Sequence, residues 1–502
     1  MGQKLAALKE RLGTISDINS SLAMISWDQE TYMPPGAAKF RGYQLATLGR
    51  LSHELFTADE TGTLLDAAAK EVKGLDYDSD DASLIRIVKR DYELARKLPS
   101  SLVAEFAQVT TAAKEAWKEA YHTSKFSTFQ PHLEKVLALT IKKAEAYGYK
   151  DHIYDPLLDE YEPGMKTAHV SKIFSDLKPH LVSLVEQISE RAPSDDSCIH
   201  LDFDEQAQLK FGNETIAEFG FDFKRGRQDL SHHPFCSGFT SDDVRLTTRV
   251  ERDFLSPCLF GLFHECGHGL YEQGVRENLA RTLLADGTSL GVHESQSRMW
   301  ENIVGRSRGF WKFCYPKIQK AFPAQLKSLP METFYRAINR VKPSLIRVEA
   351  DEVTYNLHIM LRFELETQMV SGKIAVKDLP KLWNAKVEEY LGIKPSNDTE
   401  GVLQDIHWSM GGIGYFSTYA LGNLMSAQLY ERAQKDISGL GKQIESGKFD
   451  GLLSWLRKKI HVHGRKFTAN ELLERVTGEP LQSRSYLNYI KTKFSDIYGE
   501  LD

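Results

Sequence analysis

The chain contains few cysteines for its length, only five among 502 residues. They are Cys198, Cys236, Cys258, Cys266 and Cys314. Their number is odd, and no two of them form a Cys-x-x-Cys pair. Proteins that depend on disulfides normally carry an even set of cysteines. The cysteine content therefore argues against a disulfide framework and favours a reducing compartment.

The chain also lacks a long apolar segment. No run of about 18 apolar residues occurs, and a transmembrane helix needs about that length. The N-terminal sequence MGQKLAALKE has no apolar stretch of the kind found in signal peptides. Gly2 is followed by Ala6, where N-myristoylation requires Ser or Thr. We therefore expect a cytoplasmic protein without a membrane partner.

Neither sign of charge dominates. The 63 Lys and Arg residues and the 69 Asp and Glu residues give a net charge of -6. This weak acidic balance gives no reason to expect a nucleic acid or an anionic membrane as a partner. The basic stretch at residues 457–463 is typical of a solvated helix face. With 41% hydrophobic and 26% charged residues, the composition is that of an ordinary globular protein.

Apolar residues recur at helical spacing through most of the chain, beginning with residues 3–26. A Pro pair and a Gly interrupt the pattern in residues 27–36. In residues 199–250 Gly, Phe, Ser and Thr become frequent, and residues 233–240 and 243–250 have the pattern of short strands. We therefore predict a mainly α-helical protein with a small β-sheet.

The segment His264-Glu265-Cys266-Gly267-His268 lies in an apolar stretch that predicts a buried helix. Two histidines four residues apart on a helix differ by about 40° in direction and about 6 Å in height, so both can reach one metal ion. Glu265 lies beside them and can take a proton from a metal-bound water. This is the H-E-x-x-H arrangement of zinc-dependent peptidases, although a match this short also arises by chance.

A catalytic zinc site needs a third protein ligand. Glu272 lies one further turn along the same helix, but ligands on three successive turns span about 12 Å, too far for bonds of about 2 Å. Glu294 lies on a separate predicted helix that can approach from the side. We expect Glu294 to complete the ligand set and Glu272 to lie outside it. The metzincin pattern is excluded because Tyr271 and Gly274 stand where it needs Gly and His.

These residues predict a hydrolytic mechanism. Zinc would lower the pKa of its water and polarise a peptide carbonyl. Glu265 would accept the water proton and pass it to the leaving amine. The oxyanion needs a further donor, and His407, Tyr415 and Tyr419 in the Gly-rich segment 401–424 are the candidates. The alternative for each of these three is an ordinary buried polar ring.

Five motifs, in order, resemble those of one family, the M32 zinc metallocarboxypeptidases. They are Asp243-x-Arg245-x-Thr247, His264-Glu265-x-x-His268, His293-Glu294-Ser295-Gln296, Ile346-Arg347-x-x-Ala350-Asp351 and Gly401-x-x-Gln404-Asp405-x-His407-Trp408. The segments 27–34 and 352–358 are also similar, so the likeness covers essentially the whole chain. Five spaced motifs are far more specific than H-E-x-x-H alone.

The resemblance implies a helical ellipsoid with a long, deep central groove and zinc at its floor. It implies an enzyme that removes single C-terminal amino acids from peptides with broad preference, and often a homodimer. It also makes Glu294 the third metal ligand. Because imidazole and carboxylate ligands accept several divalent ions, Co²⁺ is an open substitute for Zn²⁺.

We expect one metallopeptidase domain over residues 1–502, with two lobes beside the groove as the alternative division. Residues 192–197 form the clearest linker in the chain. The helical pattern is alike on its two sides, so the linker by itself does not mark a domain boundary.

A carboxypeptidase must also hold the free carboxylate of its substrate, which Arg does best with a bidentate grip. Arg347, in the fourth motif, is our candidate for this role. The alternative is a structural ion pair between Arg347 and Asp351. For Asp243 and Arg245 we expect a structural charge pair.

Two other functions stay open from the residues alone. The first is an oligopeptidase or dipeptidyl carboxypeptidase of the related helical-groove type, which would cut internally or release dipeptides. The second is a non-catalytic binding protein that a metal stabilises. Peptide products separate the first from a carboxypeptidase, and the effect of replacing Glu265 separates the second.

Overall fold

The computed structural model describes residues 2–501, which group into two compact units. Unit 1 comprises the chain up to Arg96, Asp196–Ile338 and Leu429–Gly478. Unit 2 comprises Lys97–Asp195, Asn339–Gln428 and the chain from Glu479 onward. One boundary, between Asp195 and Asp196, falls within the linker noted in the sequence. A single metallopeptidase domain over the whole chain stays a prediction.

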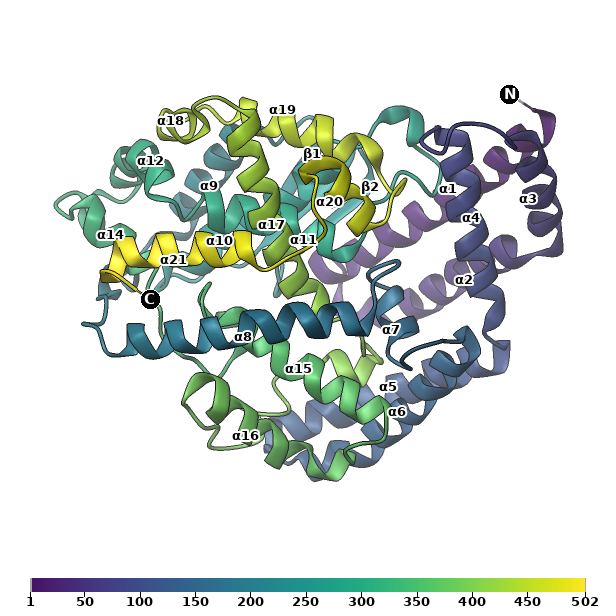
Figure 1. Cartoon of the computed structure of the whole chain (residues 1–502), viewed down its shortest axis with the longest axis horizontal. Helices are drawn as coiled ribbons and strands as arrows, with labels where there is room; N and C mark the ends of the chain where they lie inside the picture. Colours follow the sequence, from purple (N-terminus) through teal and green to yellow (C-terminus); the bar gives the residue numbers. More distant parts are fainter. Residues whose placement is uncertain (1, 502) are drawn as a thin grey trace. The chain divides into compact units, whose positions relative to one another are not determined.

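Unit 1 is mainly helical, with a small sheet (Figure 1). Its α-helices are α1 (Gln3–Thr31), α2 (Ala38–Thr57), α3 (Asp59–Glu71), α4 (Asp80–Lys97), α9 (Glu205–Phe219), α10 (Leu255–Glu272), α11 (Leu290–Arg298), α12 (Arg308–Ala321), α13 (Pro323–Leu326), α14 (Met331–Ile338), α18 (Leu440–Glu445), α19 (Asp450–Lys459) and α20 (Ala469–Thr477). A π-helical segment, η4 (Met299–Val304), continues α11. Short 3₁₀ turns are η1 (Pro35–Ala37), η2 (Ser197–Ile199), η3 (Glu277–Leu279) and η8 (His461–His463).

The sheet of unit 1 contains β1 (Gly226–Leu230), β2 (Cys236–Thr240) and β3 (Asp243–Thr248), in the order β1-β3-β2. β3 is parallel to β1 and antiparallel to β2. β2 and β3 fall within the two segments predicted as strands. β1 was not predicted, because its sequence GRQDL has no apolar alternation and it becomes a strand by pairing with β3. The mainly α class with a small sheet beside the metal-motif helix is confirmed.

Helix α10 carries the metal motif and packs against the sheet, α9 and α11. It is buried along most of its length, as expected for a helix that is apolar on nearly every side. Helix α11 crosses it at Gly267, where a Cβ atom would lie 2.5 Å from the carbonyl oxygen of Gln296 and the Cα of Ser297. The absence of a side chain at Gly267 therefore permits the close approach that brings α11 to the metal motif.

The described part of unit 2 consists of helices that pack on one another, and it contains no sheet. They are α5 (Ser100–Thr123), α6 (Phe126–Tyr147), α7 (Asp155–Asp159), α8 (Thr167–Ser189), α15 (Tyr355–Val370), α16 (Leu379–Leu391), α21 (Arg484–Tyr498) and the first part of α17 (Ser417–Asp436), with 3₁₀ turns η5 (Arg347–Glu349), η6 (Val376–Asp378) and η7 (His407–Met410). Helices α5 and α6 pack along each other, and α15 packs against α8 and α16 (Figure 1).

One predicted helix boundary is wrong. We placed Trp27–Thr31 in an interruption after the first helix, but α1 continues through these residues. No residue among them breaks a helix, and the first strong breaker is Pro34. The aromatic ring of Trp27 is consequently held on α1, where it stacks on the guanidinium of Arg245 at 4.5 Å.

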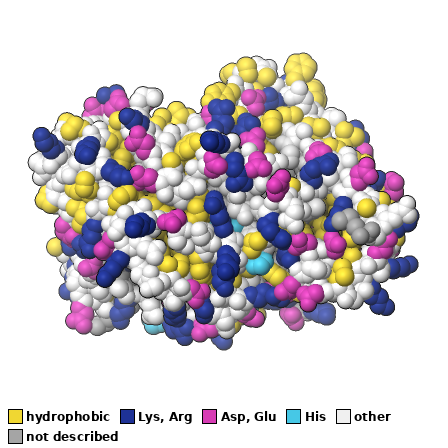
Figure 2. Space-filling model, turned by 90° about the horizontal axis from the view of Figure 1, so that it is seen from above, with side chains coloured by type: hydrophobic (Ala, Val, Ile, Leu, Met, Phe, Trp, Pro, Cys, Tyr) yellow, Lys and Arg dark blue, Asp and Glu magenta, His cyan; other side chains and the backbone are white. Residues whose placement is uncertain are grey.

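Within residues 2–501, no helix is both long and apolar enough to cross a membrane. On the face drawn in Figure 2, basic and acidic side chains are mixed. This mixing agrees with the small net charge of the sequence.

The α10–α11 crossing predicts the effect of Gly267→Ala. The new methyl group would meet backbone atoms of α11, which cannot move aside as a side-chain tip can. We expect a loss of about 1–3 kcal/mol in the free energy of unfolding, typical of overpacking. Chemical denaturation followed by circular dichroism measures it.

Gly261→Ala is the matched control on the same helix. A Cβ atom at position 261 would lie 3.4 Å from the Thr248 hydroxyl, an ordinary contact, and alanine favours the helix by about 0.5–1 kcal/mol. We expect this variant to be as stable as the parent or slightly more stable. Equal stability of both variants would contradict a tight crossing at Gly267.

Candidate metal centre and active site

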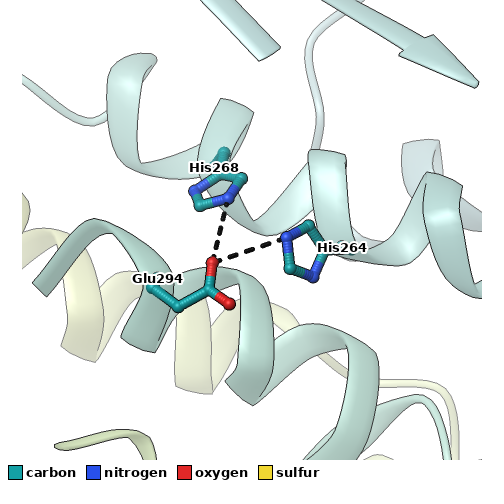
Figure 3. A group of neighbouring side chains, drawn as sticks. All are labelled: His264, His268 and Glu294. Carbon is teal, nitrogen blue, oxygen red and sulfur yellow. Dashed lines mark ion pairs between the residues drawn. The ribbon is translucent and has the colours of Figure 1, made fainter. Parts of the chain in front are cut away.

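His264, His268 and Glu294 form a group whose ligand atoms all lie within 4.8 Å of one another. The Nε2 atoms of both histidines lie 3.5 Å from the same oxygen, Oε2 of Glu294. In Figure 3 the two imidazoles extend from one helix toward the carboxylate of the neighbouring helix. Two imidazole nitrogens and one carboxylate oxygen are the donors of many catalytic zinc sites. The residues therefore fit a divalent metal ion.

Glu301 contacts the ring nitrogen of His264 that does not face Glu294. This nitrogen, Nδ1, lies 2.8 Å from Oε2 of Glu301 and carries a proton, so Nε2 is the ring nitrogen left to bind a metal ion. Burial opposes a positive charge on His264, but Glu294 and Glu301 outweigh it and raise its pKa to about 9. A divalent cation bound at Nε2 would displace the second proton that this pKa gives the ring near neutral pH.

His268 is held by a second histidine. Its Nδ1 lies 2.6 Å from Nδ1 of His293, whose Nε2 lies 2.6 Å from Oε1 of Glu272. Burial lowers the pKa of His268 to about 3, so the ring is neutral, as a metal ligand must be. Glu272 thus lies outside the group of His264, His268 and Glu294 and contacts it through His293.

Glu294 is oriented by its own helix. Arg298 donates from Nε to Oε1 at 2.6 Å, and the Ser297 hydroxyl donates to Oε2 at 3.0 Å. Burial would raise the pKa of Glu294, but Arg298 and the two histidines of the group hold it well below its usual range. The carboxylate is therefore ionised and ready to bind a cation.

Glu265 follows His264 directly on α10 and is buried. Burial raises its pKa to about 7, although nearby histidines act in the opposite direction. A carboxyl group with a pKa in this range can both accept and return a proton near neutral pH. The next residue, Cys266, is fully buried, as expected for a small core residue.

Arg347 lies in η5 of unit 2 and is buried. Its Nε and Nη2 donate to Oδ1 of Asp405 at 3.1 and 2.7 Å, and its Nη1 donates to the Tyr355 hydroxyl at 3.0 Å. Arg362 donates to Oδ2 of the same Asp405 at 2.7 Å. Burial would raise the pKa of Asp405, but the two guanidinium groups hold it far below its usual range.

The alternative partner proposed for Arg347 is wrong. Asp351 does not pair with it, because Arg347 lies in a 3₁₀ turn and not one helical turn before Asp351. Asp351 accepts hydrogen bonds from the backbone of Lys342, Val353 and Thr354 and so supports the start of α15.

The three oxyanion candidates lie together in unit 2. The ring centroids of Tyr415 and Tyr419 are 5.4 Å apart, and that of His407 is 5.3 Å from Tyr415. Nε2 of His407 lies 3.4 Å from the Tyr419 hydroxyl. Burial lowers the pKa of His407 to about 4, so this ring is neutral at pH 7. Arg347 lies over the Tyr419 ring at 5.0 Å and belongs to the same cluster.

Asp243 and Arg245 form the expected charge pair, with both carboxylate oxygens 2.9 Å from guanidinium nitrogens. Sequence reasoning missed Glu301 and Arg298. A usable signal was present, because positions 294, 298 and 301 carry charges of alternating sign on one stripe of a helix.

Comparisons with known proteins agree with this geometry. The family model described as Carboxypeptidase Taq (M32) metallopeptidase matches residues 7–494. Carboxypeptidase 1 of Bacillus subtilis is 38% identical over 491 residues, covering 97% of each chain. Thermostable carboxypeptidase 1 of Thermus thermophilus is 41% identical over 491 residues, covering 95% of each.

A solved structure also matches throughout. The crystal structure of the M32 carboxypeptidase from Deinococcus radiodurans R1 superposes with a TM-score of 0.97 at 39% sequence identity, covering 99% of this chain and 100% of that one. An M32 metallopeptidase requires a divalent metal, and the group of His264, His268 and Glu294 supplies a site for it. The chain therefore belongs to the M32 family and is a metallocarboxypeptidase.

Proposed function

We propose that this enzyme uses zinc to release single C-terminal amino acids from peptides with broad preference. The observation that carries this proposal is the donor set of His264, His268 and Glu294, in which both Nε2 atoms face one carboxylate oxygen. A bound zinc ion would polarise the scissile carbonyl and acidify water. Cobalt is an expected substitute, because the same donors accept several divalent ions.

Glu265 is the proposed general base. It is buried beside the ligand group, and its pKa of about 7 suits a residue that takes a proton from water. The same carboxyl group would then return the proton to the nitrogen of the leaving amino acid. Burial also keeps bulk water from competing for that proton.

Arg347 is the proposed contact for the carboxylate of the substrate. Two buried guanidinium groups, of Arg347 and Arg362, share one carboxylate, Asp405. Asp405 compensates only one of these two positive charges. A peptide carboxylate would complete the balance, and it would gain from the low dielectric of a buried site.

His407, Tyr415 and Tyr419 are proposed as hydrogen-bond donors for the oxyanion that forms at the scissile carbonyl. The ring of Tyr419 lies 5.0 Å from the guanidinium of Arg347, and the ring of His407 is neutral, so each of the three can donate a hydrogen bond without carrying a charge. Which of the three makes the contact is part of the proposal to be tested.

The remaining expectations stay predictions. They are a peptide with a free C-terminus as substrate, a homodimer, a central groove, a cytoplasmic location and the absence of nucleic-acid and membrane partners. Size-exclusion chromatography with light scattering tests the oligomeric state.

Glu265→Gln tests the general base. The amide keeps the size of the side chain but cannot accept the water proton, so kcat should fall by about a thousandfold. Zinc content, measured by metal analysis, should stay at that of the parent, because Glu265 is not a ligand. Peptides with blocked N-termini and free C-termini serve as substrates.

Glu277→Gln, an exposed position shortly after α10, is the control and should leave kcat unchanged. Full activity of Glu265→Gln would remove Glu265 from the mechanism. Mass spectrometry of the products tests the mode of cleavage in the same assay. Loss of one residue at a time supports the proposal, whereas dipeptides or internal cuts would favour the oligopeptidase alternative.

Arg347→Ala tests carboxylate recognition. We expect kcat/KM for peptides with a free C-terminus to fall by about 100-fold, since a buried charge-assisted contact is worth about 2–5 kcal/mol. Arg347→Lys, which keeps the charge but loses the bidentate geometry, should fall less. Thermal melting of both variants separates binding from folding.

Arg484→Ala is the control in the same unit, because Arg484 makes an exposed ion pair with Glu479. It should keep the kcat/KM of the parent. A folded Arg347→Ala variant with parental kcat/KM would assign Arg347 a purely structural role with Asp405.

A further inference from the structure

We propose that His293 and Glu272 form a relay of positioning residues that fixes His268 in its metal-binding tautomer. The inference rests on the proposed metal site and deepens it. Neither residue belongs to the ligand group, and both lie on the side of His268 away from Glu294. His268 contacts His293, and His293 contacts Glu272, with 2.6 Å for each step.

The positions of the protons along the relay follow from the chemistry of its three side chains. An ionised Glu272 only accepts, so Nε2 of His293 carries a proton. In a neutral His293, Nδ1 is then an acceptor, and the 2.6 Å contact with Nδ1 of His268 requires the proton to be on His268. Nε2 of His268 consequently has a free lone pair, and it is this atom that faces Glu294.

The surroundings leave room for both relay residues. Gly238 in β2 stands against Glu272, and a Cβ atom there would lie 2.6 Å from Oε2 of Glu272. Gly287, shortly before α11, stands against His293, and a Cβ atom there would lie 2.9 Å from Cδ2 of the ring. A side chain at either glycine would displace a member of the relay, so the relay occupies a space that two separate segments provide.

The two histidine ligands are supported differently. Nδ1 of His264 contacts a carboxylate directly. This carboxylate is that of Glu301, which lies on the π-helical segment η4 after α11. His268 and Glu272 are four residues apart on α10, yet His293 of α11 stands between them, with its ring centroid 4.7 Å from that of His268. The relay therefore couples the orientation of His268 to the position of α11, the helix that also supplies Glu294.

Partners of this kind orient a ligand ring and raise its basicity, and their loss commonly weakens metal binding by about 10- to 100-fold. If the contacts were only structural, their loss would lower stability without a specific effect on the metal. The two roles can be separated because, among residues 2–501, the hydrogen-bonded path from Glu272 to His268 runs through His293. Replacing Glu272 should therefore have no further effect once His293 is absent.

The experiment is a double-mutant cycle on the full chain with His293→Phe, Glu272→Gln and the double variant. The dissociation constant for Zn²⁺ is measured by competition with a chromophoric chelator, and thermal melting monitors folding. We expect affinity to fall by about 10- to 100-fold in His293→Phe and by less in Glu272→Gln. The double variant should match His293→Phe alone, because the two residues act in series. Glu277→Gln is the control.

Parental zinc affinity in folded His293→Phe, or additive losses in the double variant, would overturn the relay. If His293→Phe does not fold, Glu272→Gln still decides, because parental affinity in that variant also overturns it. A parent chain that binds no zinc would instead refute the proposed metal site itself. The visible spectrum of the Co²⁺ form gives a second readout, and it should change in His293→Phe because the geometry at His268 changes.

Discussion

The close crossing of α10 and α11 at Gly267 is the contact on which the candidate site depends. α10 supplies His264 and His268, while α11 supplies Glu294. No side chain separates the two backbones at Gly267, where a Cβ atom would lie 2.5 Å from α11. Because the two helices approach so closely, the carboxylate of Glu294 can reach the Nε2 atoms of both histidines.

Opposite charges compensate one another around the metal group of unit 1 and around Arg347 in unit 2. Near the metal group, Arg298 contacts both Glu294 and Glu301, and Arg306 lies 3.6 Å from Glu301 as a second guanidinium. In unit 2, Arg347 and Arg362 share one carboxylate, that of Asp405. Unpaired buried charges are costly, so these residues constrain one another.

The fold class and most of the metal-ligand group could be predicted from the sequence, because the patterns that indicate them lie within single segments. Helical periodicity and the four-residue spacing of His264 and His268 are properties of one segment. The argument that Glu272 is too far along the helix also needed only helix geometry. The partner of Arg347 could not be predicted, because Asp405 lies 58 residues away and no local rule pairs them. Strand β1 was missed for a similar reason, since its pairing with β3 defines it.

The amino-acid sequence alone specifies which residue types are available and how they repeat along each helix. It thereby specifies the H-E-x-x-H pair, the helical class and the motifs that resemble one family. The side chains that support the two histidine ligands emerge only in the folded protein: Glu301 contacts His264, and His293, itself in contact with Glu272, contacts His268. This difference arises because periodicity follows from the backbone of one segment, whereas a hydrogen bond between helices depends on how closely and at which residue the helices cross.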